Sequence, residues 1–423
     1  MELSTAKGTR DLYPEDVILL ERAVRVLRRN FELFGFSPLE TPSIENLSVL
    51  ASKYTGGAEI LKETFKLKDQ GGRDLGLRYD LTVPFARFVA MNPQLKMPFK
   101  RYQIGRVFRD GPVSTNRLRE FTQCDCDVVG TKSLAADAEC ILLFLQCFQE
   151  MGLAVEVRVN NRKILDELMA ALQIKENLRE RVILAIDKLD KKTKKEVEDE
   201  IVALGIPRNT VEKLFTVFDS QGTNEEILKR ISAVVGVESV GVAELREVLS
   251  YVDSVKVVPS LARGLAYYTG TIFEVYYTEI RQSIGSGGRY DKMISALLGS
   301  SQEYPAVGCS FGLDVIMNAL KTRREKVEKS VVSVYVVPIG LPVAKVWGIV
   351  SELRAGGVAT DVAFASKGVS KGLEYANAYT IPYVVLVGED ELKAKKVKLK
   401  DMKTGKEELL SVKQVVKKMM QKP

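Results

Sequence analysis

The chain contains no histidine among its 423 residues. This absence excludes Ser-His-Asp and Cys-His catalysis, histidine-ligated metal sites and switches that depend on imidazole titration. Any chemistry must therefore use carboxylates, arginine, lysine, tyrosine, backbone groups, or the acids and bases of the substrate itself.

Cysteine is scarce, and long apolar runs are absent. The five cysteines are odd in number and include no Cys-x-x-Cys pair, which favours a reducing compartment and argues against a zinc knuckle. Runs such as Ile141–Leu145 and Val331–Pro338 are far shorter than the ~20 residues that cross a bilayer, and Met1–Ser4 lacks the pattern of a secretion signal. We therefore expect a cytoplasmic protein with no membrane partner.

The net charge of +7 is concentrated near the C-terminus. Residues 331–423 hold 15 Lys and Arg against 9 Asp and Glu, whereas the preceding residues are nearly neutral. A basic segment of this kind suits a polyanionic partner, although a lysine-rich solvated surface is an equal alternative on charge alone.

The spacing of apolar residues distinguishes helical from strand-rich segments along the chain. Helical spacing predicts one long helix from Pro14 to Gly35, followed by an extended edge segment to Pro42. Strand patterns dominate residues 64–130, apart from a helical stretch near 83–91, and residues 133–151 and 154–159 have the patterns of an amphipathic helix and a strand. Strand patterns resume at 255–291, whereas residues 163–251 are densely charged and helical in pattern. We expect an α/β fold, α+β in its catalytic core, with residues 163–251 as a helical insertion.

A second unit is expected after the charged segment 321–329, which is a linker candidate. Strand patterns at 332–338, 358–363 and 383–388 alternate with helical patterns at 342–356 and 367–379. This alternation is typical of an α/β unit. We therefore expect two domains, residues 1–325 and residues 326–423.

The first candidate site is a pair of strands joined by an arginine-containing loop. Alternation along the second strand places one set of side chains on a single face, namely Arg119, Phe121, Gln123, Asp125 and Asp127. Arg109 and Arg117 carry forked donors that suit phosphate oxygens, so we interpret this face as a ligand surface. A solvent-facing strand with cross-strand ion pairs is the alternative. Cys124 and Cys126 have the opposite parity and should point into the core.

Three smaller clusters could also carry chemistry. Arg263 precedes two tyrosines, Tyr267 and Tyr268, although an exposed turn would have the same residues. Residues 283–291 are rich in glycine but fit neither the dinucleotide fingerprint nor a Walker loop. The third cluster is the pair Asp80 and Thr82, which could hold a cationic amine or could cap the helix that follows.

Together these clusters resemble the histidyl-tRNA synthetases, a family of class II aminoacyl-tRNA synthetases. The similarity lies in Lys7–Asp11, Leu77–Pro84, Phe108–Phe121, Leu261–Gly270, Gly285–Asp291 and Gly308–Leu313. The run Leu-Ala-Arg-Gly-Leu-Ala-Tyr-Tyr-Thr-Gly is very specific to this family, whereas Arg…Arg-x-x-x-Phe marks class II in general. The resemblance implies an antiparallel catalytic sheet flanked by helices, a helical insertion and a C-terminal α/β anticodon-binding domain.

The resemblance also implies a reaction and its partners. The carboxylate of L-histidine attacks the α-phosphorus of ATP, and a ribose hydroxyl at the 3′ end of tRNA(His) then takes the activated histidine. Positioning and charge neutralisation suffice for the first step, so a chain without histidine can perform it. Mg²⁺ is implied by the triphosphate rather than by any visible set of metal ligands. Relatives of this group are homodimers, and residues 35–45 would lie at the interface.

Matched motifs imply a role for each site residue. Arg109 and Arg263 would be the catalytic pair at the α-phosphate, while Arg117 would reach the outer phosphates and Phe121 would stack on adenine. The histidine substrate would be held by Asp80, Thr82 and Gln123 at its ammonium group, and by Asp127 and Tyr268, with Tyr267 close by, at its imidazole. Two ring nitrogens that each need a partner would explain discrimination, since an unpaired buried polar group costs ~1–3 kcal/mol.

Three positions depart from the family pattern. Gly111 replaces a Glu that commonly helps to hold adenine, Val315 replaces an Arg of the third class II motif, and Ala266 replaces a frequent Asp. The change at Val315 bears most directly on ATP handling. Arg289 and Arg323 are the candidates to compensate for it.

Two non-catalytic alternatives remain open. The chain could be a synthetase-like regulatory subunit of the histidine-biosynthetic phosphoribosyltransferase, or a sensor of uncharged tRNA. Such paralogues typically lack the anticodon domain or erode the arginine motifs, whereas this chain keeps Arg109, Arg117 and Arg263 and has a C-terminal domain. These residues favour the enzyme.

Overall fold

The computed structural model describes residues 3–51, 61–114, 117–263, 267–280, 282–323, 328–365 and 368–421. The chain forms two compact units. One comprises the residues up to Asp11 and those from Ala23 to Arg323, and the other comprises Leu12–Arg22 and the residues after Arg323. Ala266 and part of the predicted linker 321–329 lie outside the described residues. No helix in the part of the chain that is described is long and apolar enough to span a membrane.

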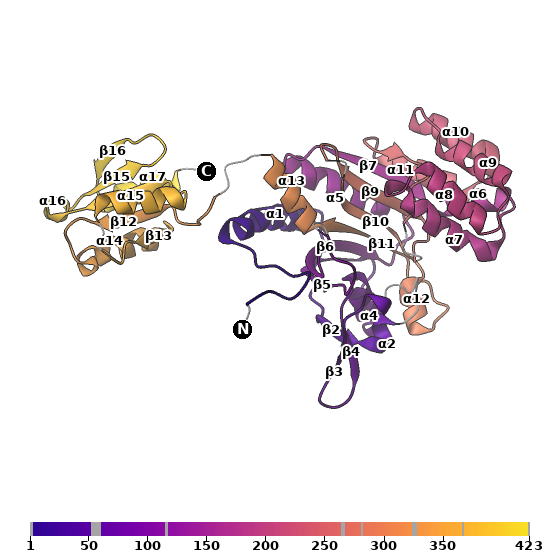
Figure 1. The fold of residues 1–423 in the computed structure, drawn as a ribbon, viewed down its shortest axis with the longest axis horizontal. Coiled ribbons are helices and arrows are strands. Elements are labelled where there is room, and N and C mark those ends of the chain that lie inside the picture. Colours follow the sequence, from indigo (N-terminus) through magenta and orange to yellow (C-terminus); the bar gives the residue numbers. More distant parts are fainter. Residues whose placement is uncertain are drawn as a thin grey trace. The chain divides into compact units, whose positions relative to one another are not determined.

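The first unit is built on an eight-stranded sheet (Figure 1). In spatial order its strands are β1 (Ser37–Pro38), β5 (Phe99–Phe108), β6 (Glu120–Val129), β11 (Ala306–Gly312), β10 (Gln282–Arg289), β9 (Thr271–Tyr277), β7 (Val155–Asn161) and β8 (Lys256–Val257). Neighbouring strands are antiparallel, except for the parallel edge pairs β1–β5 and β7–β8. The predicted antiparallel catalytic sheet is confirmed.

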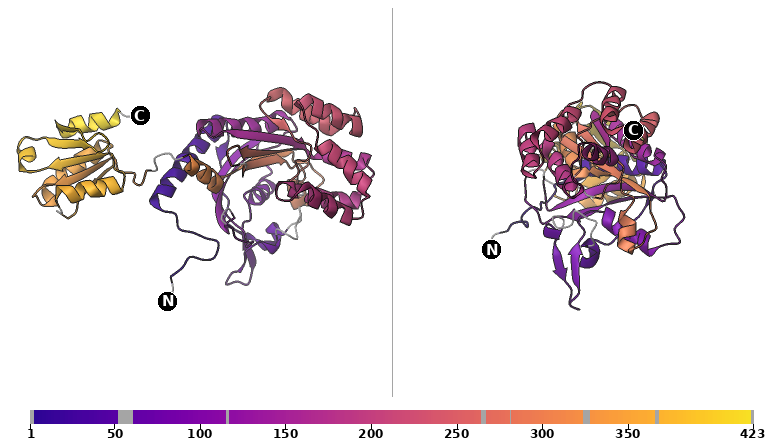
Figure 2. Two further views of the ribbon diagram at one scale, coloured as in Figure 1. Left: turned by 45° about the horizontal axis from the view of Figure 1, so that its top comes forward. Right: turned by 90° about the vertical axis from the view of Figure 1, so that its right-hand side faces the viewer.

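One face of this sheet is apolar and is covered by helices, as Figures 1 and 2 show. These are α1 (Pro14–Leu33), of which the residues from Ala23 belong to this unit, α5 (Ala135–Glu150) and α13 (Leu313–Thr322). Their core is aromatic: the ring centroid of Phe144 lies 4.3 Å from that of Phe311 and 6.0 Å from that of Phe273. Because side chains alternate along a strand, the residues between these core positions face the opposite side of the sheet.

A smaller layer lies on the opposite side of the sheet (Figure 1). It contains α2 (Leu47–Leu50), α4 (Thr82–Met91), α12 (Met293–Leu298) and a three-stranded sheet of β2 (Ile44–Asn46), β4 (Asp74–Leu77) and β3 (Lys66–Lys68). Helices α4 and α12 share a core that includes Phe85, Val89 and Ile294. This layer brings the start of α4 over the second face of the large sheet.

The predicted insertion is helical throughout and leaves the sheet after β7. It consists of α6 (Arg162–Ala171), α7 (Glu176–Ile186), a 3-10 turn (Asp187–Asp190), α8 (Lys194–Ala203), α9 (Arg208–Phe218), α10 (Asn224–Val235) and α11 (Val240–Tyr251). Capping boxes begin α8 at Thr193 and α10 at Thr223, which explains why the helical pattern starts cleanly there. Figure 2 shows these helices gathered at one end of the sheet.

The second unit is a five-stranded sheet with helices. Its strands are ordered β13 (Thr360–Val362), β12 (Val334–Pro338), β14 (Tyr383–Val387), β15 (Val397–Asp401) and β16 (Glu407–Leu410), and its helices are α14 (Val343–Ala355), α15 (Val369–Ala378), α16 (Glu389–Lys393) and α17 (Val412–Met420). The predicted parallel α/β elements are present. The antiparallel pair β15–β16 and helix α17 were not predicted, although Val397 and Leu399 are buried and alternate with lysines in a strand pattern.

Candidate active site

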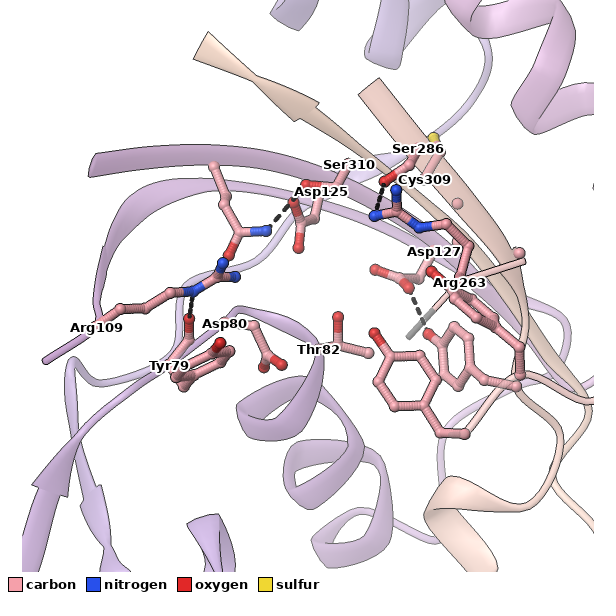
Figure 3. A pocket seen from close by; sticks show the side chains of 17 residues that line it. Tyr79, Asp80, Thr82, Arg109, Asp125, Asp127, Arg263, Ser286, Cys309 and Ser310 are labelled. Atoms are coloured by element: carbon pink, nitrogen blue, oxygen red, sulfur yellow. Dashed lines mark hydrogen bonds between the residues drawn. The ribbon is translucent and has the colours of Figure 1, made fainter. Parts of the chain in front are cut away.

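A pocket opens on the polar face of the large sheet, next to the start of α4 (Figure 3). Its lining residues are Tyr79, Asp80, Thr82, Arg109, Gln123, Asp125, Asp127, Arg263, Tyr267, Tyr268, Ser286, Gly287, Gly288, Tyr290, Gly308, Cys309 and Ser310. Eight of the predicted site residues therefore converge, although they come from separate parts of the sequence. Arg117 and Phe121 are not among the lining residues.

Glycines on β10 and β11 make room for the pocket. A Cβ atom added at Gly308 would lie 2.0 Å from Asp127 Oδ1, and one added at Gly288 would lie 2.8 Å from the ring of Tyr268. Both distances are shorter than atoms tolerate, so any larger residue would displace the side chains that line the pocket. The glycine-rich run that looked weak in the sequence is thus part of the floor of the site.

Asp127 lies at one end of the pocket in an ion pair. Arg101 Nη2 lies 2.6 Å from Asp127 Oδ2, and both side chains are almost fully buried. The hydroxyl of Tyr290 donates to Asp127 Oδ1, while Oδ2 receives no well-aligned hydrogen bond, because the contact with Arg101 lacks hydrogen-bond geometry. Burial raises the pKa of Asp127, and Arg101 opposes that rise. The carboxylate is therefore charge-compensated, and its Oδ2 accepts no well-aligned hydrogen bond from the described residues.

Gln123 and Asp125 lie next to Asp127 on the same face of β6. Gln123 Nε2 donates to Ser310 Oγ at 3.0 Å. Gln123 Oε1 and Asp125 Oδ1 are both buried and have no hydrogen-bond partner. Burial raises the pKa of Asp125 to about 7, against the lowering effect of Arg101. Two residues that line the pocket therefore each have a buried acceptor oxygen without a donor among the described residues.

Asp80 performs the capping role that was the alternative from sequence, and it also lines the pocket. Its Oδ1 accepts a hydrogen bond from Val83 N at 2.9 Å in the first turn of α4. Burial raises the pKa of the carboxyl group, and the backbone hydrogen bond opposes this. Thr82 follows at the start of the helix, with its side chain drawn toward the pocket in Figure 3.

Arg263 lies toward the other end of the pocket from Arg109 (Figure 3). Its Nη1 lies 2.7 Å from Glu274 Oε1, and its Nη2 donates to Ser286 Oγ at 3.0 Å. Burial by itself would lower the pKa of Arg263, but the Glu274 carboxylate outweighs it, so the pKa is raised and the charge is secure. Its buried Nε has no hydrogen-bond partner among the described residues.

Arg109 lies between two aromatic rings. Its guanidinium carbon is 4.2 Å from the ring centroid of Tyr79 and 4.9 Å from that of Phe121. Stacking of this kind fixes the plane of the guanidinium group. Its Nε donates to the carbonyl oxygen of Tyr79 at 3.4 Å, so an anion would meet the terminal nitrogens. Arg117 is half-exposed and forms a 2.5 Å ion pair with Glu63, whose other oxygen accepts from Tyr79 Oη at 3.2 Å.

Tyr267 and Tyr268 both line the pocket, with ring centroids 4.8 Å apart. Burial raises the pKa of Tyr268 to about 12, so its hydroxyl remains protonated and can donate. Cys124 and Cys126 are fully buried free thiols on the core side, as their parity predicts. The solvent-facing alternative for β6 is wrong, because most of its residues are buried.

Sequence reasoning missed several residues that support the site. Arg101, Glu274, Ser286, Tyr290 and Ser310 are ordinary strand residues whose importance depends on cross-strand neighbours, and sequence spacing does not reveal those neighbours. The strand register of the folded sheet reveals them, because it pairs Gly308 with Asp127 and Ser310 with Asp125.

The structure also bears on two of the three departures, since Ala266 lies outside the described residues. A Cβ atom at Gly111 would lie 2.8 Å from Glu63 Oε1, so the carboxylate of Glu63 occupies space that a side chain at position 111 would need. Arg289 is buried in ion pairs with Asp137 and Asp291 and does not line the pocket. Arg323 donates to the carbonyl of Met151. The suggestion that Arg289 compensates for Val315 is therefore wrong, because the guanidinium group of Arg289 is already paired with two carboxylates inside the fold.

The arrangement suits a ligand that carries charges of both signs. Arg109 and Arg263 present cations at separated points, and Asp80, Asp125 and Asp127 lie between them (Figure 3). A cationic group would lie near the unpartnered acceptors, and an anionic centre would lie between the guanidinium groups. Such a site stabilises charge that develops on a phosphate without any proton shuttle.

Comparisons with known proteins agree with one another. The family model described as histidyl-tRNA synthetase matches residues 8–316, and the model described as anticodon binding domain matches residues 333–422. Histidine–tRNA ligase 2 of Shouchella clausii is 41% identical over 416 residues, which cover 96% of this chain and 98% of that protein. Histidine–tRNA ligase 1 of Bacillus thuringiensis is 40% identical, with 96% and 97% covered. The crystal structure of histidyl-tRNA synthetase from Nostoc superimposes with a TM-score of 0.87 at 29% identity, with both chains fully covered.

The buried ion pair yields a stability prediction. We expect Arg101→Met to lower the free energy of unfolding by about 3–5 kcal/mol at about pH 8, because Asp127 is then buried without a counter-charge. The loss should shrink as the pH falls, since the raised pKa lets the carboxyl group take up a proton. Urea unfolding followed by circular dichroism measures both effects.

Arg106→Met is the matched control, because Arg106 is half-exposed and lies 3.8 Å from Glu120. It should change the free energy of unfolding by about 1 kcal/mol or less. Equal losses in the two variants, or a loss at Arg101 that does not depend on pH, would contradict the role given to the pair.

Proposed function

Since the chain belongs to the histidyl-tRNA synthetase family and acts as a histidine–tRNA ligase, we propose that the pocket described above is where L-histidine is activated. The observation that carries this proposal is the convergence of Arg109 and Arg263 on one pocket from distant parts of the sequence. The family implies ATP as the energy source and tRNA as the acceptor. The non-catalytic alternatives are not favoured, because the relatives are named as ligases over almost their full length.

In the first step, a carboxylate oxygen of L-histidine forms a bond to the α-phosphorus of ATP. The bond from that phosphorus to the bridging oxygen breaks, and pyrophosphate leaves. Arg109 and Arg263 are the proposed catalytic residues, because guanidinium groups on opposite sides neutralise the charge that develops at the α-phosphate. A carboxylate is already a sufficient nucleophile, so this step needs no general base.

In the second step, a ribose hydroxyl at the tRNA 3′ end attacks the activated carbonyl carbon. The bond from that carbon to the adenylate oxygen breaks, and AMP leaves. The hydroxyl proton can pass to a phosphate oxygen of the leaving AMP, so the substrate supplies the base. This route agrees with a chain that has no histidine side chain.

We assign the amino-acid subsite by the charges described above. Asp80, Thr82 and Gln123 would receive the ammonium group, and Asp127 would accept a hydrogen bond from an imidazole N–H at its open Oδ2. Tyr268 would donate to the other ring nitrogen, with Tyr267 packed beside it. A neutral imidazole suits Asp127, because Arg101 already compensates the carboxylate charge.

The nucleotide subsite is proposed to extend from Arg109 toward Arg117 and Phe121. Phe121 would stack on adenine, and Arg117 would exchange its ion pair with Glu63 for the outer phosphates of ATP. Mg²⁺ is proposed to arrive with the triphosphate. The described residues include no group of three or more carboxylate or thiol side chains that could hold a metal ion by themselves.

Several broader assignments are also proposals. We propose residues 1–325 as the class II catalytic domain, with the insertion at 163–251, and residues 326–423 as the anticodon-binding domain. We further propose a cytoplasmic homodimer with residues 35–45 at its interface. The short parallel edge strand β1 supports this last assignment, because an edge strand at Ser37–Pro38 remains open to further pairing.

The function is tested by ATP–pyrophosphate exchange with the purified protein and each of the twenty amino acids. We expect exchange with L-histidine alone and aminoacylation of tRNA(His) but not of other tRNAs. Histidine binding without exchange would favour the regulatory paralogue instead.

Removal of the Arg263 guanidinium should slow activation. We expect Arg263→Ala to lower the rate of exchange by about 10²–10³-fold, as loss of a charge-stabilising donor does elsewhere. Arg158→Ala is the control, because Arg158 lies on β7 outside the pocket. Circular dichroism should accompany both, because the Ala variant leaves the buried Glu274 unpaired; an unchanged exchange rate would refute the role.

Asp127 should contribute to the binding of L-histidine rather than to that of ATP. We expect Asp127→Asn to weaken L-histidine binding at least about 10-fold, since an open acceptor is lost. Binding of ATP, measured by calorimetry on the same preparation, should change less than about twofold. Equal losses for the two ligands would contradict an imidazole contact.

A further inference from the structure

The three carboxylates of the pocket differ in the hydrogen bonds and ion pairs that they form within the protein. Asp80 accepts a backbone hydrogen bond at the start of α4. Asp127 is compensated by Arg101 and receives the hydroxyl of Tyr290. Asp125 is buried to 3% exposure, its Oδ1 has no hydrogen-bond partner, and no ion pair within the described residues involves it. Asp125 therefore keeps one buried oxygen without a donor, and the charge of Arg101 and a hydrogen bond with Ser310 offset its burial only in part, since its pKa is still raised to about 7.

We propose that Asp125 is the counter-ion of the substrate α-ammonium group, which donates a hydrogen bond to Asp125 Oδ1 beside Gln123 Oε1. This assignment rests on the proposed function and adds a residue to the site given above. A buried carboxylate with an unpartnered oxygen is costly unless something brings a donor to it. A zwitterionic amino acid brings a cation with three N–H donors, which can satisfy Asp125 and Gln123 together.

Asp125 and Asp127 differ in whether an arginine pairs with them, and this difference predicts which group of the substrate each would bind. Asp127 is paired and suits a neutral N–H donor, so it fits an imidazole. Asp125 is unpaired and suits a cation, so it fits an ammonium group. Asp125 and Asp127 are two residues apart on one face of β6, a spacing of roughly 7 Å, which is comparable to the span between an amino group and a distant ring nitrogen.

The surroundings of Asp125 determine how its protonation should respond. The polar and charged groups that face it are Gln103 from β5 and Ser310 from β11 at paired register, Gln123 and Asp127 from β6, Arg101, Arg78, and Asp80 from the segment before α4. Burial raises the pKa of Asp125 to about 7, Arg101 opposes the rise, and Asp127 and Asp80 add to it. A bound ammonium group favours the ionised form, so a proton should leave Asp125 on binding, and binding should weaken as the pH falls below about 7.

The test pairs one protein variant with two ligands that differ only at the ammonium group. L-Histidine carries the imidazole, the carboxylate and the ammonium group, whereas imidazole-4-propionate lacks only the ammonium group. We expect Asp125→Asn to weaken L-histidine binding about 10–100-fold, as expected for the loss of a charge-assisted hydrogen bond, and to leave imidazole-4-propionate binding within about twofold. Glu156→Gln, which removes a charge from β7 outside the pocket, should change neither.

A second measurement compares proton release. Calorimetry of wild type and of Asp125→Asn with L-histidine, in buffers of different ionisation enthalpy near pH 7, should detect release of about half a proton more with the wild type. The ligand is the same in both titrations, so the titration of its imidazole group cancels in the comparison.

The outcomes are distinct. Equal weakening of both ligands by Asp125→Asn, or no weakening of either, would overturn the assignment of Asp125 alone, provided that wild type binds L-histidine. Absence of the difference in proton release would overturn it as well. A wild type that binds L-histidine no better than other amino acids would overturn the proposed function and this assignment with it.

Discussion

The pocket on the large sheet depends on the buried ion pair between Arg101 and Asp127. Both side chains lie within the sheet, where an unpaired charge would cost several kcal/mol, so each residue is tolerable only because the other is present. The pair fixes the carboxylate of Asp127 beside Tyr290 and leaves its second oxygen without a well-aligned hydrogen bond. Gly308 makes the arrangement possible, because any side chain there would collide with Asp127. A polar recognition site is thereby built inside an apolar sheet.

Neighbouring side chains also fix the two arginines of the pocket in place. Arg263 is held by Glu274 and Ser286, and Arg109 is held by the rings of Tyr79 and Phe121, so both cations keep fixed positions. Preorganised charge of this kind stabilises a reacting phosphate without moving protons. A chain that contains no histidine can therefore activate an amino acid, since the carboxylate nucleophile and the phosphate oxygens provide the remaining chemistry.

The departures from the family pattern show why a linear motif is an incomplete description of a site. Gly111 looks like a lost carboxylate, yet Glu63 places a carboxylate against that position from a distant segment. Arg289 looks like a spare cation, yet it is committed to Asp137 and Asp291 inside the fold. Whether a charge is available for a ligand depends on its partners, and partners far apart in sequence are brought together only by folding.

Local pattern was sufficient for most of the architecture. Helical spacing, strand alternation and capping residues depend on neighbours within a few positions, so the long first helix, the helical insertion, the main strands and the α/β unit could all be predicted from the sequence. The parity of Gln123, Asp125 and Asp127 on one strand face was likewise a local property. Only the tertiary structure decided which carboxylate is neutralised, which one keeps a buried oxygen without a donor and which arginines reach the pocket. Strand register and burial set those charges, and both arise from contacts between segments that the sequence places up to nearly two hundred residues apart, such as Asp127 with Gly308.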